Sequence, residues 1–124
     1  MSLFLKLMII TLFAISLNAR TNDNNKTKKC INGVCSWYGK NFDGKRTASG
    51  TRFDSKKNTA AHKTLPFGTK LKVTDTKSGK STIVTVNDRG PFSKSRVLDI
   101  SSAAAKELEV INRGTFSAKI EILD

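Results

Sequence analysis

Few side chains in this sequence can transfer a proton near neutral pH, because only ten of its 124 residues are Asp or Glu and one is His. Asp88 is the carboxyl in the most suggestive position: it follows a β-branched run and precedes Gly90-Pro91, a turn that can hold a side chain at the surface. A carboxyl held in this way can act as a general acid or base. A structural interpretation is also open, in which Asp88 bonds to Arg89 or to the amides of the turn.

His62 and Asp99 are the other candidates for this chemistry. His62 is the only histidine and ends the Ala-rich segment 59–62, where a lone histidine is more often a packed or hydrogen-bonded structural residue than a functional one. Asp99 lies just before Ser101, where helix capping or loop anchoring is the expected role. One histidine and two cysteines are too few ligands for a closed zinc site, so neither a metal nor an organic cofactor is expected.

The N-terminal segment has the features of a signal peptide. A start containing Lys6 is followed by an apolar run over residues 7–17, which is short for a membrane span. We predict a signal peptide over residues 1–19 and export to the periplasm or cell envelope; an uncleaved membrane anchor is the alternative. No cysteine follows the run closely, so there is no evident lipobox. Residues 20–29 contain no apolar side chain and are predicted to be a flexible tether.

Export would place the two cysteines in an oxidising compartment, where they could pair. Between Cys30 and Cys35 lies Asn32-Gly33, the strongest two-residue hairpin signal, which would set the two cysteines opposite each other about 4.5 Å apart. A disulfide between Cys30 and Cys35 is therefore predicted, closing a short loop at the start of the domain. Two reduced thiols are the alternative.

The formal net charge of +12 points to polyanionic partners, such as a cell wall carrying carboxylates, anionic lipid or nucleic acid. The lysines are scattered along the chain and do not gather on one helical stripe or alternate with aromatic residues on a strand. Together with export, this distribution argues against a specific nucleic-acid partner.

Short alternating or β-branched runs dominate the rest of the chain and predict strands at 34–38, 70–74, 82–87, 96–100 and 118–123. Helical signal is limited to 59–62 and to 101–110, where Ser101 or Ser102 can cap the first turn and Asn112-Arg113-Gly114 supplies a stop. Several short strands in so short a chain favour a small closed barrel, which leaves no exposed sheet edge. A monomer is expected.

Three segments carry a family resemblance: Ser36-Trp37-Tyr38-Gly39, Thr59-Ala60-Ala61-His62-Lys63-Thr64-Leu65-Pro66-Phe67-Gly68-Thr69 and Val86-Asn87-Asp88-Arg89-Gly90-Pro91-Phe92. They resemble the double-psi β-barrel domain of the rare lipoprotein A (RlpA) family, and the resemblance extends over residues 34–123. It implies that residues 30–124 form an all-β, six-stranded double-psi β-barrel with one or two short helices and a groove for an extended polysaccharide.

The resemblance also implies a chemistry. Active family members are similar to lytic transglycosylases, which cut the bond between N-acetylmuramic acid and N-acetylglucosamine in peptidoglycan glycan strands and leave a 1,6-anhydro ring. On this basis Asp88 is the expected acid, with His62 assisting it or contacting substrate. The expected substrate contacts are Tyr38, Ser49, Thr51 and Arg89. Alternation along the strand places the ring of Trp37 on the interior side and that of Tyr38 toward the groove.

One departure from the family pattern leaves two hypotheses open. Catalytically competent members usually carry Glu eleven positions before the histidine, where this chain has Thr51, which cannot exchange a proton near neutral pH. The chain is then either an active transglycosylase or a noncatalytic module that binds glycan strands and helps to organise the wall. Other cell-wall or division proteins are further candidate partners. An exported effector or inhibitor built on the same barrel is a third hypothesis.

Overall fold

A computed structural model of the chain describes residues 29–123. The predicted signal peptide, 1–19, and all but the last residue of the predicted tether, 20–29, lie outside the described residues. Within 29–123, no helix is long and apolar enough to cross a membrane.

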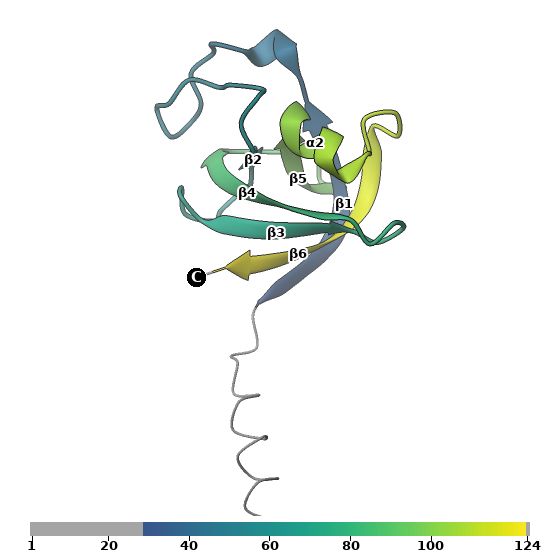
Figure 1. Cartoon of the computed structure of the whole chain (residues 1–124). Helices are drawn as coiled ribbons and strands as arrows, with labels where there is room; N and C mark the ends of the chain where they lie inside the picture. The colour runs from purple at the N-terminus through teal and green to yellow at the C-terminus, as the bar shows by residue number, and fades with distance from the viewer. Residues whose placement is uncertain (1–28, 124) are drawn as a thin grey trace, which may run out of the picture.

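Six strands close into a barrel in the order β1-β5-β2-β4-β3-β6. The pairs β1/β5 and β2/β4 are parallel and the other four are antiparallel (Figure 1). The elements are β1 (Cys30–Tyr38), the 3-10 helix η2 (Lys40–Phe42), β2 (Thr59–Ala61), β3 (Lys70–Asp75), β4 (Ser81–Asp88), β5 (Arg96–Ser101), α2 (Ser102–Leu108) and β6 (Thr115–Leu123). The predicted all-β, six-stranded barrel with short helices is confirmed.

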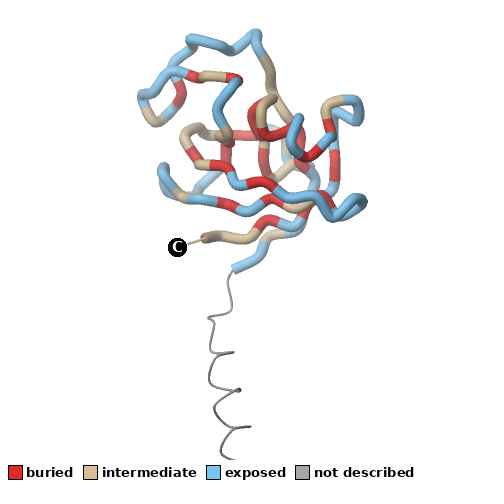
Figure 2. Tube along the Cα trace, viewed as in Figure 1, coloured by how far each residue is buried: buried red, intermediate tan, exposed pale blue. Residues whose placement is uncertain are grey.

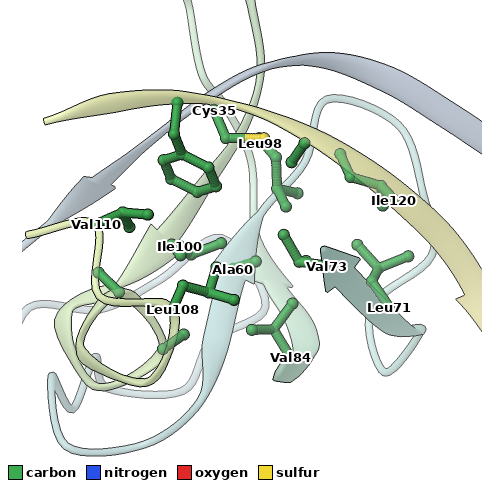
Figure 3. Packing of buried hydrophobic residues seen from close by; sticks show 14 of the residues in the cluster. Cys35, Ala60, Leu71, Val73, Val84, Leu98, Ile100, Leu108, Val110 and Ile120 are labelled. Carbon is green, nitrogen blue, oxygen red and sulfur yellow. The ribbon is translucent and has the colours of Figure 1, made fainter. Parts of the chain in front are cut away.

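The barrel interior is filled by side chains that alternate along each strand. On β3 and β4 the apolar residues Leu71, Val73, Val84 and Val86 are fully buried, whereas the residues between them face outward. Figure 3 shows Leu71, Val73 and Val84 meeting side chains of the neighbouring strands inside the barrel. The tube in Figure 2 shows the same alternation of buried and exposed positions. This packed interior leaves the outer face and the loops for function.

Two local predictions were corrected at the short elements. The segment 59–62 was expected to be helical, but Thr59–Ala61 is strand β2 between β4 and β5. Ala60 is fully buried there, so pairing and packing outweigh the helix preference of alanine. The prediction of α2 is confirmed with Ser101 as its N-cap, but the helix ends earlier than expected, at Glu109 in the left-handed conformation (φ 58°).

The predicted disulfide is wrong. Cys30 and Cys35 lie on the same continuous strand β1, not on two arms of a hairpin. Five residues of extended chain separate their Cα atoms by roughly 16 Å, far beyond the 4.4–6.8 Å or so that a disulfide spans. Cys35 is fully buried in the core, and burial, with a smaller effect of Asp99, raises the pKa of its thiol to about 12. A thiol with this pKa is unreactive at neutral pH.

Gly33 shows why the hairpin signal failed. The residue stays extended within β1, which pairs with β5 on one side and β6 on the other. A Cβ atom at Gly33 would lie 2.8 Å from both methyl carbons of Val97. The glycine at this position therefore serves a close approach between strand and side chain, and not the left-handed turn for which Asn-Gly pairs are known.

A buried ion pair joins the β3–β4 turn to the segment before β6. Asp75 is fully buried, and its Oδ2 accepts hydrogen bonds from the Ser78 hydroxyl (2.7 Å) and from Arg113 Nη2 (2.5 Å). Burial by itself raises the pKa of Asp75, but the bonds from Ser78 and the charge of Arg113 outweigh it, so the pKa lies below its ordinary value.

Arg113→Ala is expected to lower the free energy of unfolding by about 3 kcal/mol, because it leaves the Asp75 charge buried without its partner. Lys80→Ala, which breaks the exposed Lys80–Glu109 pair, is the control and should change little. Because the folded pKa of Asp75 is depressed, the pair stabilises above the ordinary value of 3.8 and this contribution is lost as the pH falls through the folded pKa. Urea unfolding at neutral and acidic pH measures both effects; equal losses in the two variants would contradict them.

Candidate active site

A β-bulge turns Asp88 toward the outer face of the barrel. Ala60 pairs with Val86, but the register shifts at the next residue, so that Ala61 pairs with Asp88 and not with Asn87. Val86 faces the core, and strict alternation would send Asp88 inward as well. The extra residue brings Asp88 beside Ala61 on the outer face, as bulges near active sites commonly do.

The carboxylate of Asp88 is half-buried and is held through one of its two oxygens. Oδ1 accepts hydrogen bonds from the backbone N–H groups of Ala48 and Arg89, both at 2.9 Å. Oδ2 accepts no hydrogen bond from any residue of the described segment 29–123. The structural interpretation expected Asp88 to bond to amides of the turn, and one of these bonds, from Arg89, is present. Together with the bond from Ala48 it fixes the carboxylate and leaves the second oxygen available for proton transfer.

Three hydroxyl groups gather in the loop that contacts Asp88. Thr47 Oγ1 lies 2.9 Å from Ser49 Oγ and 3.0 Å from Thr51 Oγ1, and the last two atoms are 3.1 Å apart. The Ser49 N–H donates to the carbonyl of Asn87 at 3.2 Å, which ties the loop to the end of β4. The predicted residues Ser49 and Thr51 are thus brought to Asp88 by the loop. Thr47, buried at the centre of the cluster, was not predicted.

His62 lies in the turn after β2, and its backbone N–H donates to the carbonyl of Asp88 at 3.1 Å. Its side chain is largely buried, and its Nδ1 accepts the N–H groups of Thr64 (3.1 Å) and Leu65 (3.0 Å). The ring is therefore neutral with its proton on Nε2. Burial, and then the charges of Arg89 and Lys63, lower its pKa below 6.5. In this arrangement His62 positions the turn and the backbone of Asp88.

The imidazole of His62 should titrate below pH 6.5 and carry its proton on Nε2 when neutral. Because the folded pKa is depressed, the neutral ring stabilises the fold above about pH 6.5, and that contribution declines as the pH falls to the folded pKa. As His62 is the only histidine, its ring ¹⁵N shifts give the pKa and the tautomer without assignment by mutation. A pKa above 6.5, or a proton on Nδ1, would contradict this arrangement.

Arg89 points away from Asp88 and forms part of the rim. Its guanidinium donates to the carbonyls of Leu65 (2.8 Å) and His62 (3.3 Å) and stacks on the ring of Phe67 at 4.0 Å. Phe92 is 94% exposed and borders a hollow of about 290 Å³ together with Lys63, Arg89, Gly90 and Pro91. An exposed aromatic ring offers apolar area against which the face of a sugar ring can pack, and neighbouring polar groups can bond to the sugar hydroxyls. Neither Phe67 nor Phe92 was predicted as a contact, although both lie in the motifs of the resemblance.

Tyr38 and Trp37 lie on opposite sides of β1, as alternation predicts. Trp37 packs partly against the core, and its Nε1–H donates to the carbonyl of Ile111 at 3.3 Å. The half-buried Tyr38 ring contacts Phe42 edge-on (centroids 5.7 Å apart) and Phe53 (4.6 Å), and it lines a hollow of about 600 Å³ beside η2. Its hydroxyl is buried.

The electrostatics of the site centre on its two carboxylates, Asp88 and Asp99. Burial, and then the charges of Asp88 and Asp99, raise the pKa of Tyr38 against a smaller lowering effect of a hydrogen bond with Thr59. Within the segment 29–123, no three residues of the types His, Cys, Asp and Glu lie close enough together to hold a metal ion. What the site offers is a fixed carboxylate, a cluster of hydroxyl groups and a cationic, aromatic rim.

Comparison with known proteins assigns the chain to a family. A family model described as "Lytic transglycolase" matches residues 31–120. The chain belongs to this RlpA-like double-psi β-barrel family. The endolytic peptidoglycan transglycosylase RlpA of Neisseria meningitidis serogroup A is 54% identical over 89 residues, which are 72% of this chain and 37% of that protein. RlpA of Vibrio cholerae is 50% identical over 91 residues, 73% of this chain and 35% of that protein. The chain thus spans about a third of the length of these relatives.

Solved structures agree on the fold. The Streptomyces papain inhibitor superposes with a TM-score of 0.64 at 22% identity, covering 77% of this chain and 96% of the inhibitor. An expansin of Clavibacter michiganensis superposes with a TM-score of 0.62 at 18% identity, covering 77% of this chain and 51% of the expansin. These likenesses, together with the strand order, support the double-psi barrel and carry no information on activity.

Proposed function

We propose that this RlpA-like domain is an endolytic peptidoglycan lytic transglycosylase, with Asp88 as its general acid and base. The observation that carries the proposal is the state of Asp88: the bulge turns it outward, two amides fix Oδ1, and Oδ2 has no partner within the described chain. The relatives named as endolytic peptidoglycan transglycosylases, 50–54% identical over this domain, support the choice of substrate.

The reaction needs one carboxyl that acts twice. Asp88 first gives its proton to the glycosidic oxygen as the bond from that oxygen to C1 of N-acetylmuramic acid breaks. The 6-hydroxyl oxygen of the same sugar then bonds to C1, and its proton passes to the Asp88 carboxylate. No water is consumed, a 1,6-anhydro ring is formed, and Asp88 regains its proton. Because the nucleophile is internal, the second carboxyl that ordinary glycosidases use as nucleophile or base is not required.

The remaining site residues position the glycan in this proposal. The hydroxyls of Thr47, Ser49 and Thr51 can exchange hydrogen bonds with sugar hydroxyls next to Asp88. Arg89 is already bonded to two carbonyls, so it holds the 62–65 turn and Phe67 in place at the rim. The exposed ring of Phe92 supplies apolar area for a sugar face.

We further propose that the protein acts in the periplasm or cell envelope after export directed by residues 1–19. The basic charge of +12 supports a wall partner, because the glycan and its peptides carry carboxylates. Other cell-wall or division proteins remain candidate partners. The closed barrel leaves no sheet edge for pairing between copies, which supports a monomer.

One observation favours a second function, a noncatalytic glycan-binding module. Thr51 lies in the hydroxyl cluster beside Asp88, at the position where competent family members usually carry Glu. A module of this kind would use the same hydroxyls and rings to hold glycan strands without cutting them.

Incubation with purified peptidoglycan sacculi separates the two functions. A transglycosylase releases soluble glycan fragments in proportion to time and enzyme, whereas a binding module sediments with intact sacculi and releases nothing. We expect release. Asp88→Asn should sediment with the sacculi without releasing fragments, which controls for loss of binding. Sedimentation of the parent protein without release would replace the first function with the second.

A further inference from the structure

Asp99 and Asp88 lie in one lateral row on the outer face of the barrel. Ala61 of β2 pairs with Asp99 of β5 on one side and with Asp88 of β4 on the other. Residues paired across strands project from the same face of a sheet. Two strand spacings separate the Cα atoms of the two aspartates by roughly 10 Å, and only the methyl group of Ala61 lies between them in this row.

The Asp99 carboxylate is fixed through one oxygen, as that of Asp88 is. Its Oδ1 accepts the Ser36 hydroxyl and forms an ion pair with Arg96 Nη1 at 3.3 Å. Oδ2 has no hydrogen-bond partner in the described part of the chain, and the side chain remains 18% exposed. Asp99 does not cap α2, because Ser101 does so. Of the two roles expected from the sequence, helix capping is therefore wrong. The carboxylate is anchored on the strand face by Ser36 and Arg96 and keeps a small exposed fraction.

Tyr38 lies on the same side of the barrel wall as the two aspartates. Its side chain projects from the same face of β1 as that of Ser36, whose hydroxyl donates to Asp99, and its own hydroxyl is buried. After burial, the charges of Asp88 and Asp99 both raise the pKa of Tyr38. The row through Ala61 therefore places both carboxylates on one face of the barrel, and Tyr38 lies on that face of the neighbouring strand β1.

We propose that Asp99 is the second carboxylate of the active site, where its negative charge stabilises the positive charge that develops on the sugar ring when the glycosidic bond breaks. The inference rests on the proposed transglycosylase function. In glycosidases, working carboxyl pairs lie about 5–9.5 Å apart, a range consistent with two side chains that rise from one face about 10 Å apart at Cα. Asp99 transfers no proton in this scheme. Its charge takes the place of the carboxylate that the family usually carries at position 51, where this chain has Thr51.

A purely structural role is the competing explanation, since Asp99 also ties β5 to β1 through Ser36. Asp99→Asn keeps the hydrogen bond, because the asparagine oxygen still accepts the Ser36 hydroxyl, and removes the charge together with its partly exposed ion pair to Arg96. Glu121→Gln on β6 is the matched control: it removes one negative charge from a residue whose side chain forms no hydrogen bond or ion pair within 29–123.

The experiment measures cleavage of glycan strands by the parent, Asp99→Asn and Glu121→Gln proteins, with thermal unfolding of each. For Asp99→Asn we expect kcat to fall on the order of 100-fold, with KM nearly unchanged and the unfolding midpoint close to that of the parent. Glu121→Gln should behave as the parent does. If the parent is active and Asp99→Asn is equally active, the role of Asp99 is overturned and the proposed function stands. The same holds if Asp99→Asn loses activity only to the extent that it unfolds. A parent protein that makes no product overturns the proposed function and not this inference.

Discussion

Asp88→Asn should reduce the rate of glycan cleavage by about 10³-fold and leave the barrel folded. The asparagine oxygen can still accept the two amide hydrogen bonds from Ala48 and Arg89, so the loop and the turn keep their anchor. The amide group cannot deliver a proton to the glycosidic oxygen or take one from the 6-hydroxyl. Chromatography of products from defined glycan strands measures the rate, and sedimentation with sacculi measures binding.

Asp54→Asn is the matched control for this prediction. Asp54 lies in the connection between η2 and β2, and its Oδ1 accepts the N–H of Lys56 at 3.0 Å, a local turn contact away from the hydroxyl cluster. The variant carries the same chemical change and should cleave at the parent rate. An Asp88→Asn protein that retains a third of the parent rate, or an Asp54→Asn protein that loses as much activity, would rule out Asp88 as the acid.

Thr51→Glu should raise kcat by about tenfold, less than the roughly 10²- to 10³-fold effect common for one group that stabilises a charged transition state. Thr51 is exposed, so a longer side chain fits without repacking, and a carboxylate there can accept hydrogen bonds from the Thr47 and Ser49 hydroxyls. It would add negative charge from the loop side of Asp88. The gain is modest in this scheme because Asp99 already supplies one anion from the strand side.

Thr51→Gln tests whether charge or size is responsible for the gain. Glutamine has the length and hydrogen-bonding oxygen of glutamate without its charge, so it should leave kcat near that of the parent protein. Steady-state kinetics on peptide-free glycan strands compares the three proteins. Equal increases of kcat in the Gln and Glu variants would show that contacts, and not charge, cause the effect. No increase of kcat in the Glu variant would show that residue 51 does not reach the sugar.

The strands that alternate clearly between apolar and polar residues could be predicted, and two short segments could not. Alternation at 70–74 and 82–87 gave β3 and β4 within a residue of their observed ends, because one face of each packs into the barrel. The Ala-rich β2 carries a local helix preference that burial of Ala60 between two strands reverses. Asn32-Gly33 carries a local turn signal that pairing of both residues with β6 reverses.

The candidate site divides in the same way. Asp88, Ser49 and Thr51 could be proposed because the family motifs contain them, and the structure brings all three together. The bulge at Asn87, which turns Asp88 outward, leaves no signal in the local sequence. The row of Asp99, Ala61 and Asp88 depends on strand order, since β5, β2 and β4 are neighbours in the barrel and not along the chain. Contacts between residues tens of positions apart become visible only with the topology.

The most direct test is the analysis of glycan ends by mass spectrometry after digestion of purified strands in ¹⁸O-labelled water. The proposed reaction predicts new 1,6-anhydro ends that carry no ¹⁸O, because the sugar's own 6-hydroxyl displaces the glycosidic oxygen and water does not take part. New reducing ends that carry ¹⁸O would show hydrolysis and contradict the transglycosylase mechanism. Strands recovered without new ends, from a protein that still binds them, would show that the barrel holds glycan and does not cut it.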